Sequence, residues 1–167
     1  MPVGNSLTQR RETLHDFTLE VIRAIAETFG CHVEVNLGQR PGPDIIIRYP
    51  RDTPKLSIYI ESEVGHDTGG APKYFDNLIK RLKKYISEDL QKKRSKFIMI
   101  ITNTPRRLRN YIREKSNRQA IAKELGVEDI IEGVDIFIIP AILYREILPS
   151  LLCRILSSYV RGQLIVT

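Results

Sequence analysis

The chain has 167 residues, of which 42% are hydrophobic and 28% are charged, and its formal net charge is +6. This composition is typical of a globular protein, so we expect one domain over residues 1–167, with residues 1–8 as a loose tail. No run approaches the roughly 20 apolar residues of a membrane span, and no apolar signal core opens the chain, so we expect an intracellular, cytoplasmic protein. Cys31 and Cys153 are too few for a disulfide framework and are expected to be core thiols.

Apolar periodicity and turn residues predict the elements in chain order. A helix is expected from about residue 10 to Phe29, with Gly30 as its stop. The later elements are expected to be strands at 31–37, 44–49 and 56–64, a helix at 73–93, a strand at 96–102, a basic helix after Pro105, a short helix at 117–125 ending at Gly126, a strand at 134–139 and a helix at 147–160. Consecutive strands beside a continuous apolar run predict an α/β fold, with a mixed central sheet flanked by helices.

Like the first expected helix, two of the later helices carry apolar stripes. The stripe of helix 73–93 consists of Phe75, Leu78, Ile79, Leu82, Ile86 and Leu90. The stripe of the last helix consists of Leu148, Leu151, Leu152, Ile155 and Tyr159. The second stripe offers a surface for a two-fold homodimer, unless it covers the sheet of its own chain.

Three acidic residues lie on or beside two of the expected strands. Side chains alternate along strand 56–64, so Glu61 and Glu63 share the face opposite the isoleucines. Two carboxylates about 7 Å apart repel each other unless a cation lies between them. Asp44, at the start of the neighbouring strand, would complete a site for a hard ion such as Mg²⁺ or Mn²⁺. The alternative is that these acidic residues are simply solvated strand ends.

The segment Pro43-Asp44, a spacer and then Glu61-Ser62-Glu63 resembles the PD-(D/E)XK nuclease superfamily, in the variant where glutamate replaces the final lysine. The expected elements also follow the order of the superfamily core, αβββαβ. The resemblance implies a restriction-endonuclease-like core with C-terminal helical and strand additions. It also implies a catalytic site in which Asp44 and Glu61 hold Mg²⁺ or Mn²⁺ and Glu63 takes the place of the lysine.

The resemblance implies further candidates on two helices. Many members carry an acidic residue on the first helix, and Glu20 is the candidate metal ligand here, although a solvated helix flank explains it equally well. In some relatives the catalytic lysine comes from the helix after the acidic strand. Lys73, or else Lys80, would then supply the missing cation. The alternative is that both lysines extend into solvent from an amphipathic helix.

Basic side chains crowd two segments and indicate an anionic partner, which we expect to be DNA. The candidate phosphate-binding residues are Lys80, Lys83, Lys84, Arg106, Arg107 and Arg109. Aromatic residues are not interleaved with them, which favours duplex or branched DNA over a single-strand stacking platform.

The sequence therefore predicts an Mg²⁺-dependent endodeoxyribonuclease that works as a homodimer. One alternative is an inactive nuclease-like fold that binds DNA or a protein, because glutamate stands at the usual lysine position. A nuclease acting on RNA is a third possibility. The absence of Trp, the two Met residues and the abundance of Ile and Arg suggest a thermophilic source.

Overall fold

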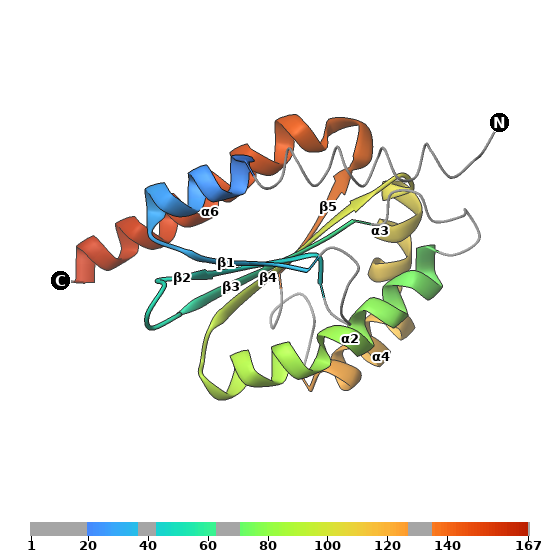
Figure 1. Ribbon diagram of the computed structural model, residues 1–167. Coiled ribbons are helices and arrows are strands. Elements are labelled where there is room, and N and C mark those ends of the chain that lie inside the picture. Colours follow the sequence, from blue (N-terminus) through green and yellow to red (C-terminus); the bar gives the residue numbers. More distant parts are fainter. Residues whose placement is uncertain (1–19, 37–42, 63–70, 127–134, 167) are drawn as a thin grey trace.

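The computed structural model describes residues 20–36, 43–62, 71–126 and 135–166 (Figure 1). The strands are β1 (His32–Val35), β2 (Ile45–Tyr49), β3 (Leu56–Ser62), β4 (Ser95–Thr102) and β5 (Asp135–Pro140). The helices are a segment at 20–29, α2 (Ala71–Gln91), α3 (Pro105–Arg113), α4 (Lys115–Leu125), the 3₁₀ turn η1 (Ala141–Leu143) and α6 (Tyr144–Val166). This order confirms the predicted succession of elements.

The five strands form one mixed sheet in the order β1-β2-β3-β4-β5. β1, β2 and β3 pair antiparallel, whereas β3, β4 and β5 pair parallel. The crossovers between parallel strands are helical, through α2 and then through α3 and α4. As a result, the carboxyl ends of β3, β4 and β5 meet at one edge of the sheet, together with the start of β2. We call this the carboxyl edge. In open α/β sheets, ligands bind at such an edge.

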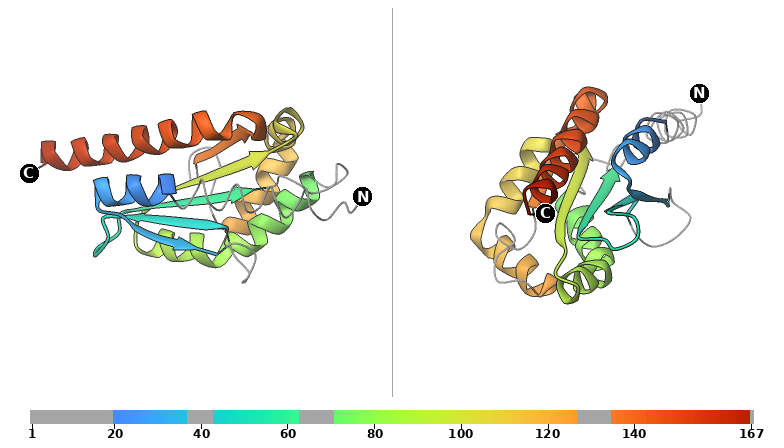
Figure 2. Two further views of the ribbon diagram at one scale, coloured as in Figure 1. Left: turned by 45° about the horizontal axis from the view of Figure 1, so that its top comes forward. Right: turned by 90° about the vertical axis from the view of Figure 1, so that its left-hand side faces the viewer.

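Helices cover both faces of the sheet (Figures 1 and 2). On one face, Leu56, Ile58 and Ile60 of β3 share a core with helix 20–29 and α6. On the other face, Tyr59 shares a second core with α2, α3 and α4. β4 contributes to both cores, Met99 and Ile101 to the first and Ile98 and Ile100 to the second, as its continuous apolar run predicts.

The predicted helix stops are confirmed at two glycines. Gly30 has φ 70° and Gly126 has φ 73°, left-handed values that glycine adopts without a steric penalty. Both cysteines have free thiols, as predicted. Cys31 is buried in the core between the sheet and α6, and Cys153 is half-buried and packs against that core. No helix in the described ranges is long and apolar enough to cross a membrane.

The apolar stripe of α6 covers the sheet of its own chain. Leu148, Leu152 and Ile155 are buried in the core that includes β3, and Leu151 and Tyr159 pack against it. The interpretation that this stripe covers the sheet of its own chain is therefore confirmed. The stripe is not a spare surface for a homodimer, because its burial within one chain already removes it from water.

The stripe predicted for α2 is correct except at its end. Phe75, Leu78, Leu82 and Ile86 are fully buried. The prediction for Leu90 is wrong, since this side chain is 37% exposed while its neighbour Asp89 is completely buried. Asp89 follows Ile86 by three residues, which places it on the same face of the helix as the apolar residues. It is tolerated there because hydroxyl groups of β3 donate hydrogen bonds to it.

Candidate functional site

Two of the predicted metal ligands lie next to each other at the carboxyl edge. β2 and β3 pair with Ile45 opposite Ile60, so continuing the register places Asp44 opposite Glu61 on the face covered by α2. The backbone N–H of Asp44 donates to Glu61 Oε2 at 3.0 Å, and the backbone N–H of Ser62 donates to Asp44 Oδ2 at 2.9 Å. These two hydrogen bonds, in which each carboxylate accepts from the backbone of the neighbouring strand, fix both carboxylates relative to the two strands.

A third charged residue, Arg81, contacts this pair, and the sequence did not predict its role. Arg81 of α2 approaches Glu61, with its Nη2 atom 3.3 Å from Glu61 Oε1. Glu61 is 3% exposed, so Arg81 supplies charge compensation where water cannot. The only sequence signal for this role was its position beside the apolar stripe, between Leu78 and Leu82, from which a long side chain can reach the sheet.

The two carboxylates have the donor chemistry that suits Mg²⁺ or Mn²⁺. Mg²⁺ is commonly held by one or two carboxylates, with waters and substrate phosphates completing its coordination. Asp44 and Glu61 supply the carboxylates on fixed strands, which fits that pattern. No group of three or more His, Cys, Asp and Glu side chains within the described ranges could hold a metal ion.

Two other predicted site residues, Glu20 and Lys80, lie within the described ranges, and both are exposed. Glu20 is exposed at the start of helix 20–29, which packs against the opposite face of the sheet. Lys80 is exposed on α2, in agreement with the alternative that it extends into solvent. Glu63 lies outside the described residues, and so does the side chain of Lys73.

The basic helix α3 begins at the same edge of the sheet. It follows β4 directly, and in Figure 1 it lies beyond the end of that strand. Leu108 buries one side of α3 in the core beneath α2, and the Tyr111 hydroxyl donates to Asp76 Oδ1 of α2 at 2.7 Å. These contacts fix the orientation of the helix. Its predicted phosphate-binding residues are all exposed: Arg106, Arg107 and Arg109.

The basic residues of α2 differ in their surroundings. Lys83 and Lys84 are both exposed, as a phosphate-binding role requires. However, Lys83 Nζ lies 3.6 Å from Glu124 Oε1 of α4. This ion pair joins the two helices at the surface and reduces the charge that Lys83 offers to a phosphate.

A second polar cluster lies farther back along β3, under the last turns of α2. Ser57 Oγ donates to Asp89 Oδ1 at 2.7 Å, and the Tyr59 hydroxyl donates to Asp89 Oδ2. Arg94 Nη1 lies 3.5 Å from Asp89 Oδ1, and its Nε donates to the Pro54 carbonyl at 3.2 Å. Burial, followed by the nearby Asp89 charge, raises the pKa of Tyr59 well above its usual value. Tyr59 therefore remains a hydrogen-bond donor at all physiological pH values.

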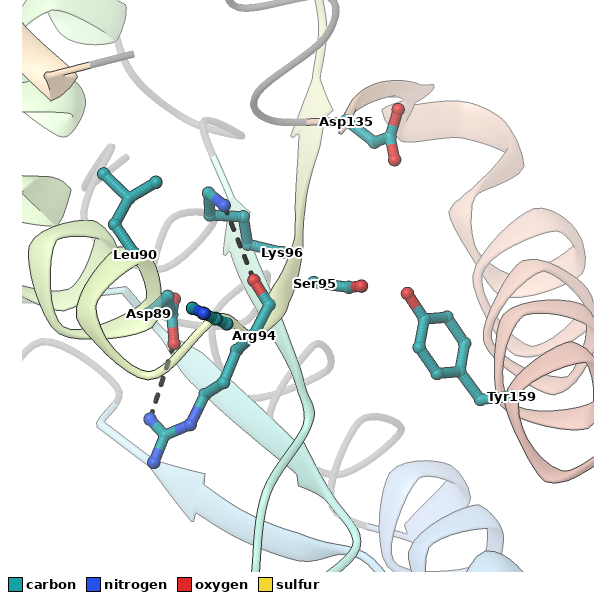
Figure 3. A pocket seen from close by; sticks show the side chains of 8 residues that line it. Asp89, Leu90, Arg94, Ser95, Lys96, Asp135 and Tyr159 are labelled. Carbon is teal, nitrogen blue, oxygen red and sulfur yellow. Dashed lines mark hydrogen bonds and ion pairs between the residues drawn. The ribbon is translucent and has the colours of Figure 1, made fainter. Parts of the chain in front are cut away.

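A pocket of about 310 Å³ opens beside this cluster (Figure 3). Lys93, Lys96, Asp135 and Tyr159 are among its lining residues. It lies at the amino ends of β4 and β5. The register places Ser95 opposite Leu56 and Ile100 opposite Glu61, so it is roughly 16 Å along the strands from the carboxylate pair. Its lining, within the part of the chain that the structure describes, includes none of the predicted catalytic or metal-binding residues.

Comparisons with protein-family models, with curated proteins and with solved structures found no match.

Proposed function

We propose that this protein is a metal-dependent DNA endonuclease with a restriction-endonuclease-like core. The observation that carries the proposal is that Asp44 and Glu61 are held together at the ends of adjacent strands, by the hydrogen bond from Asp44 N–H to Glu61 and by that from Ser62 N–H to Asp44. The order of helix 20–29, three antiparallel strands, α2 and a parallel β4 supports it, since the core of the superfamily has the order αβββαβ. The position of α3 supports DNA as the substrate, because its arginines are exposed near the same edge.

Each residue has a defined task in the proposed reaction. Asp44 and Glu61 would hold Mg²⁺ or Mn²⁺ through their carboxylate oxygens. When bound, such an ion lowers the pKa of a coordinated water and neutralises charge on the phosphate and the departing oxygen. Glu63 is the candidate for accepting the proton of the attacking water. Arg106, Arg107 and Arg109 would bind backbone phosphates and position the duplex, without reading its sequence.

Supercoiled plasmid nicking tests this function. We expect the purified protein to convert the plasmid to the open circular form in Mn²⁺ or Mg²⁺ and to leave it intact in EDTA. The Glu61→Gln variant should bind DNA in EDTA as the wild type does and should not nick it. Addition of RNA as a competitor distinguishes DNA from RNA as the preferred substrate.

The second candidate function is that of a nuclease-like DNA-binding module without catalysis. The ion pair between Arg81 and Glu61 favours it, because a carboxylate already compensated by a guanidinium has less need of a metal ion. For this function we expect DNA binding in EDTA, measured by gel shift, and no nicking in either metal. Nicking by wild-type protein that is absent in Glu61→Gln would exclude it.

A further inference from the structure

We propose that Arg81 and a divalent cation compete for Glu61, and that a DNA phosphate relieves this competition by drawing Arg81 away. The inference rests on the proposed function and adds to it a reason for metal and DNA to bind cooperatively. Arg81 becomes a positioning residue with two alternative partners, a carboxylate in the free protein and a phosphate in the complex.

The interaction that creates the competition is direct. Of the two oxygens of Glu61, Oε2 accepts the backbone N–H of Asp44 and Oε1 lies 3.3 Å from the guanidinium of Arg81. A metal ion that used Oε1 would occupy the space next to the guanidinium. Since the ion and the guanidinium are both positively charged, their mutual repulsion opposes simultaneous occupation of this carboxylate.

The backbone of α2 holds the base of Arg81 in place. Leu78 and Leu82, which flank it on the helix, are both completely buried. Farther along, Asp89 binds the hydroxyls of Ser57 and Tyr59 and so joins the end of α2 to β3. The change of partner is therefore a movement of the arginine side chain alone, with the helix remaining in position.

The side chain of Arg81 has a route to solvent. It is 32% exposed, whereas that of Glu61 is only 4% exposed, so the guanidinium lies at the outer side of the pair. A planar guanidinium forms bidentate hydrogen bonds with phosphate as readily as with carboxylate. A phosphate that approaches from solvent would offer Arg81 an equivalent partner and leave Glu61 Oε1 to the metal ion.

This exchange predicts a reciprocal coupling. If phosphate binding by Arg81 favours metal binding at Glu61, then metal binding must favour DNA binding by the same factor. Couplings between two ligands commonly amount to between about 5-fold and 150-fold in affinity. The coupling should depend on the charge of residue 81 and disappear when that charge is removed.

Isothermal titration with Mn²⁺ tests the inference without relying on cleavage. For the protein without DNA, we expect Arg81→Gln to bind Mn²⁺ about tenfold more tightly than the wild type. The matched control is Arg23→Gln, which removes the same charge from an exposed position on helix 20–29, behind the opposite face of the sheet. Its Mn²⁺ affinity should stay within about twofold of wild type.

The same titration in the presence of DNA tests the exchange of partners. With a saturating short duplex whose phosphorothioate backbone is hydrolysed slowly, the wild type should gain about tenfold in Mn²⁺ affinity. Arg81→Gln should gain much less, because the guanidinium that competes with the metal ion is absent from this variant. Thermal unfolding verifies that each variant is folded. Should Arg81→Gln fail to fold, Arg81→Met keeps the apolar stem and gives the same comparison.

The outcomes separate this inference from the proposed function. Equal or weaker Mn²⁺ binding by Arg81→Gln, with clear binding by the wild type, overturns the competition and leaves the metal site intact. If neither protein binds Mn²⁺ and the plasmid is not nicked, the proposed function fails and the competition fails with it. If Arg81→Gln binds Mn²⁺ more tightly than the wild type, and the duplex does not increase its affinity further, the result supports both the competition and the proposed metal site.

Discussion

The hydroxyl of Tyr59 on β3 donates a hydrogen bond to Asp89. Asp89 is completely buried and lies near the end of α2, the helix that also carries Arg81. The neighbouring hydroxyl of Ser57 donates to the other oxygen of Asp89. Ser57, Tyr59 and Glu61 alternate along one face of β3, so a row of polar side chains runs beneath α2. From α2, Asp89 accepts hydrogen bonds from Ser57 and Tyr59, and Arg81 forms an ion pair with Glu61. The polar contacts at the two ends of this row fix α2 against the carboxylate pair.

We expect removal of the buried carboxylate to be costly. Asp89→Ala would leave the hydroxyls of Ser57 and Tyr59 without their acceptor and would remove one of the acidic partners of the nearly buried Arg94. It should lower the free energy of unfolding by about 3–5 kcal/mol. Tyr59→Phe removes one hydrogen bond to a charged group and should cost about 2 kcal/mol. Ser87→Ala, at an exposed position on α2, is the control. Urea denaturation measures all three, and a loss for Asp89→Ala no larger than that for Ser87→Ala would contradict the cluster.

The sequence predicts the fold well because its signals are local. Alternating residues define β3, a continuous apolar run defines β4, and glycines at 30 and 126 end two helices with left-handed geometry. The placement of Asp44 on the strand next to Glu61 also follows from two short consecutive strands joined by a short loop. Each of these features depends on neighbours within a few residues or on a single turn.

The polar partners from α2 could not be predicted in the same way. The ion pair of Glu61 with Arg81 and the bonds of Asp89 to β3 depend on the rotation of α2 about its axis, to within a fraction of a turn. Leu90 and Asp89 both fit the spacing after Ile86, and hydrophobicity favours the leucine. The buried position belongs to the aspartate because the facing strand offers hydroxyl donors, which periodicity along one segment does not reveal.

Alkaline pH should destabilise the protein through Cys31. Burial raises the pKa of this thiol from 9.0 to about 11. The unfolded chain therefore releases the proton before the folded protein does, so the stability contribution is complete below pH 9 and declines as the pH rises toward 11. We expect a loss of about 1 kcal/mol between pH 9 and pH 10. Urea denaturation across this range should show a smaller loss for Cys31→Ala, and an identical slope would contradict the assignment.

Conservative changes at the carboxylate pair should separate activity from folding. Asp44→Asn and Glu61→Gln each remove a charge of the proposed metal site, so we expect nicking to fall by at least about a hundredfold. Glu61→Gln also removes the ion pair with Arg81 and should cost about 1 kcal/mol of stability. The control is Glu27→Gln, an exposed charge on helix 20–29, which should keep full activity. Nicking rates in Mn²⁺ and thermal unfolding provide the two measurements, and full nicking by Asp44→Asn would remove that residue from the site.

Truncation of the α6 stripe should affect folding and leave the oligomeric state unchanged. Leu152 is completely buried in the core with β3, so Leu152→Ala should lower the free energy of unfolding by about 3 kcal/mol. Leu143→Ala, at a side chain that is 46% exposed, should cost less than about 1 kcal/mol. Light scattering should report the same molar mass for both variants and the wild type. A change of mass in Leu152→Ala, with stability unchanged, would instead place this stripe at a subunit interface.

The arginines of α3 should control the salt dependence of DNA binding. Arg106 and Arg109 are exposed on a helix that begins at the carboxyl edge. Removing one phosphate-binding charge lowers the slope of log affinity against log salt by about one. The double variant Arg106→Gln with Arg109→Gln should therefore reduce the slope by about two units, equally for duplexes of different sequence. Fluorescence anisotropy in EDTA, over a series of salt concentrations, measures this slope.

Two further variants test whether this salt dependence belongs to the surface of α3. Arg154→Gln removes an exposed charge from α6, behind the opposite face of the sheet, and should retain the wild-type slope. Lys83→Gln should change the slope less than either α3 arginine, because Lys83 is paired with Glu124. If Arg154→Gln reduced the slope as much as an α3 variant does, net charge, and not the surface of α3, would attract the DNA.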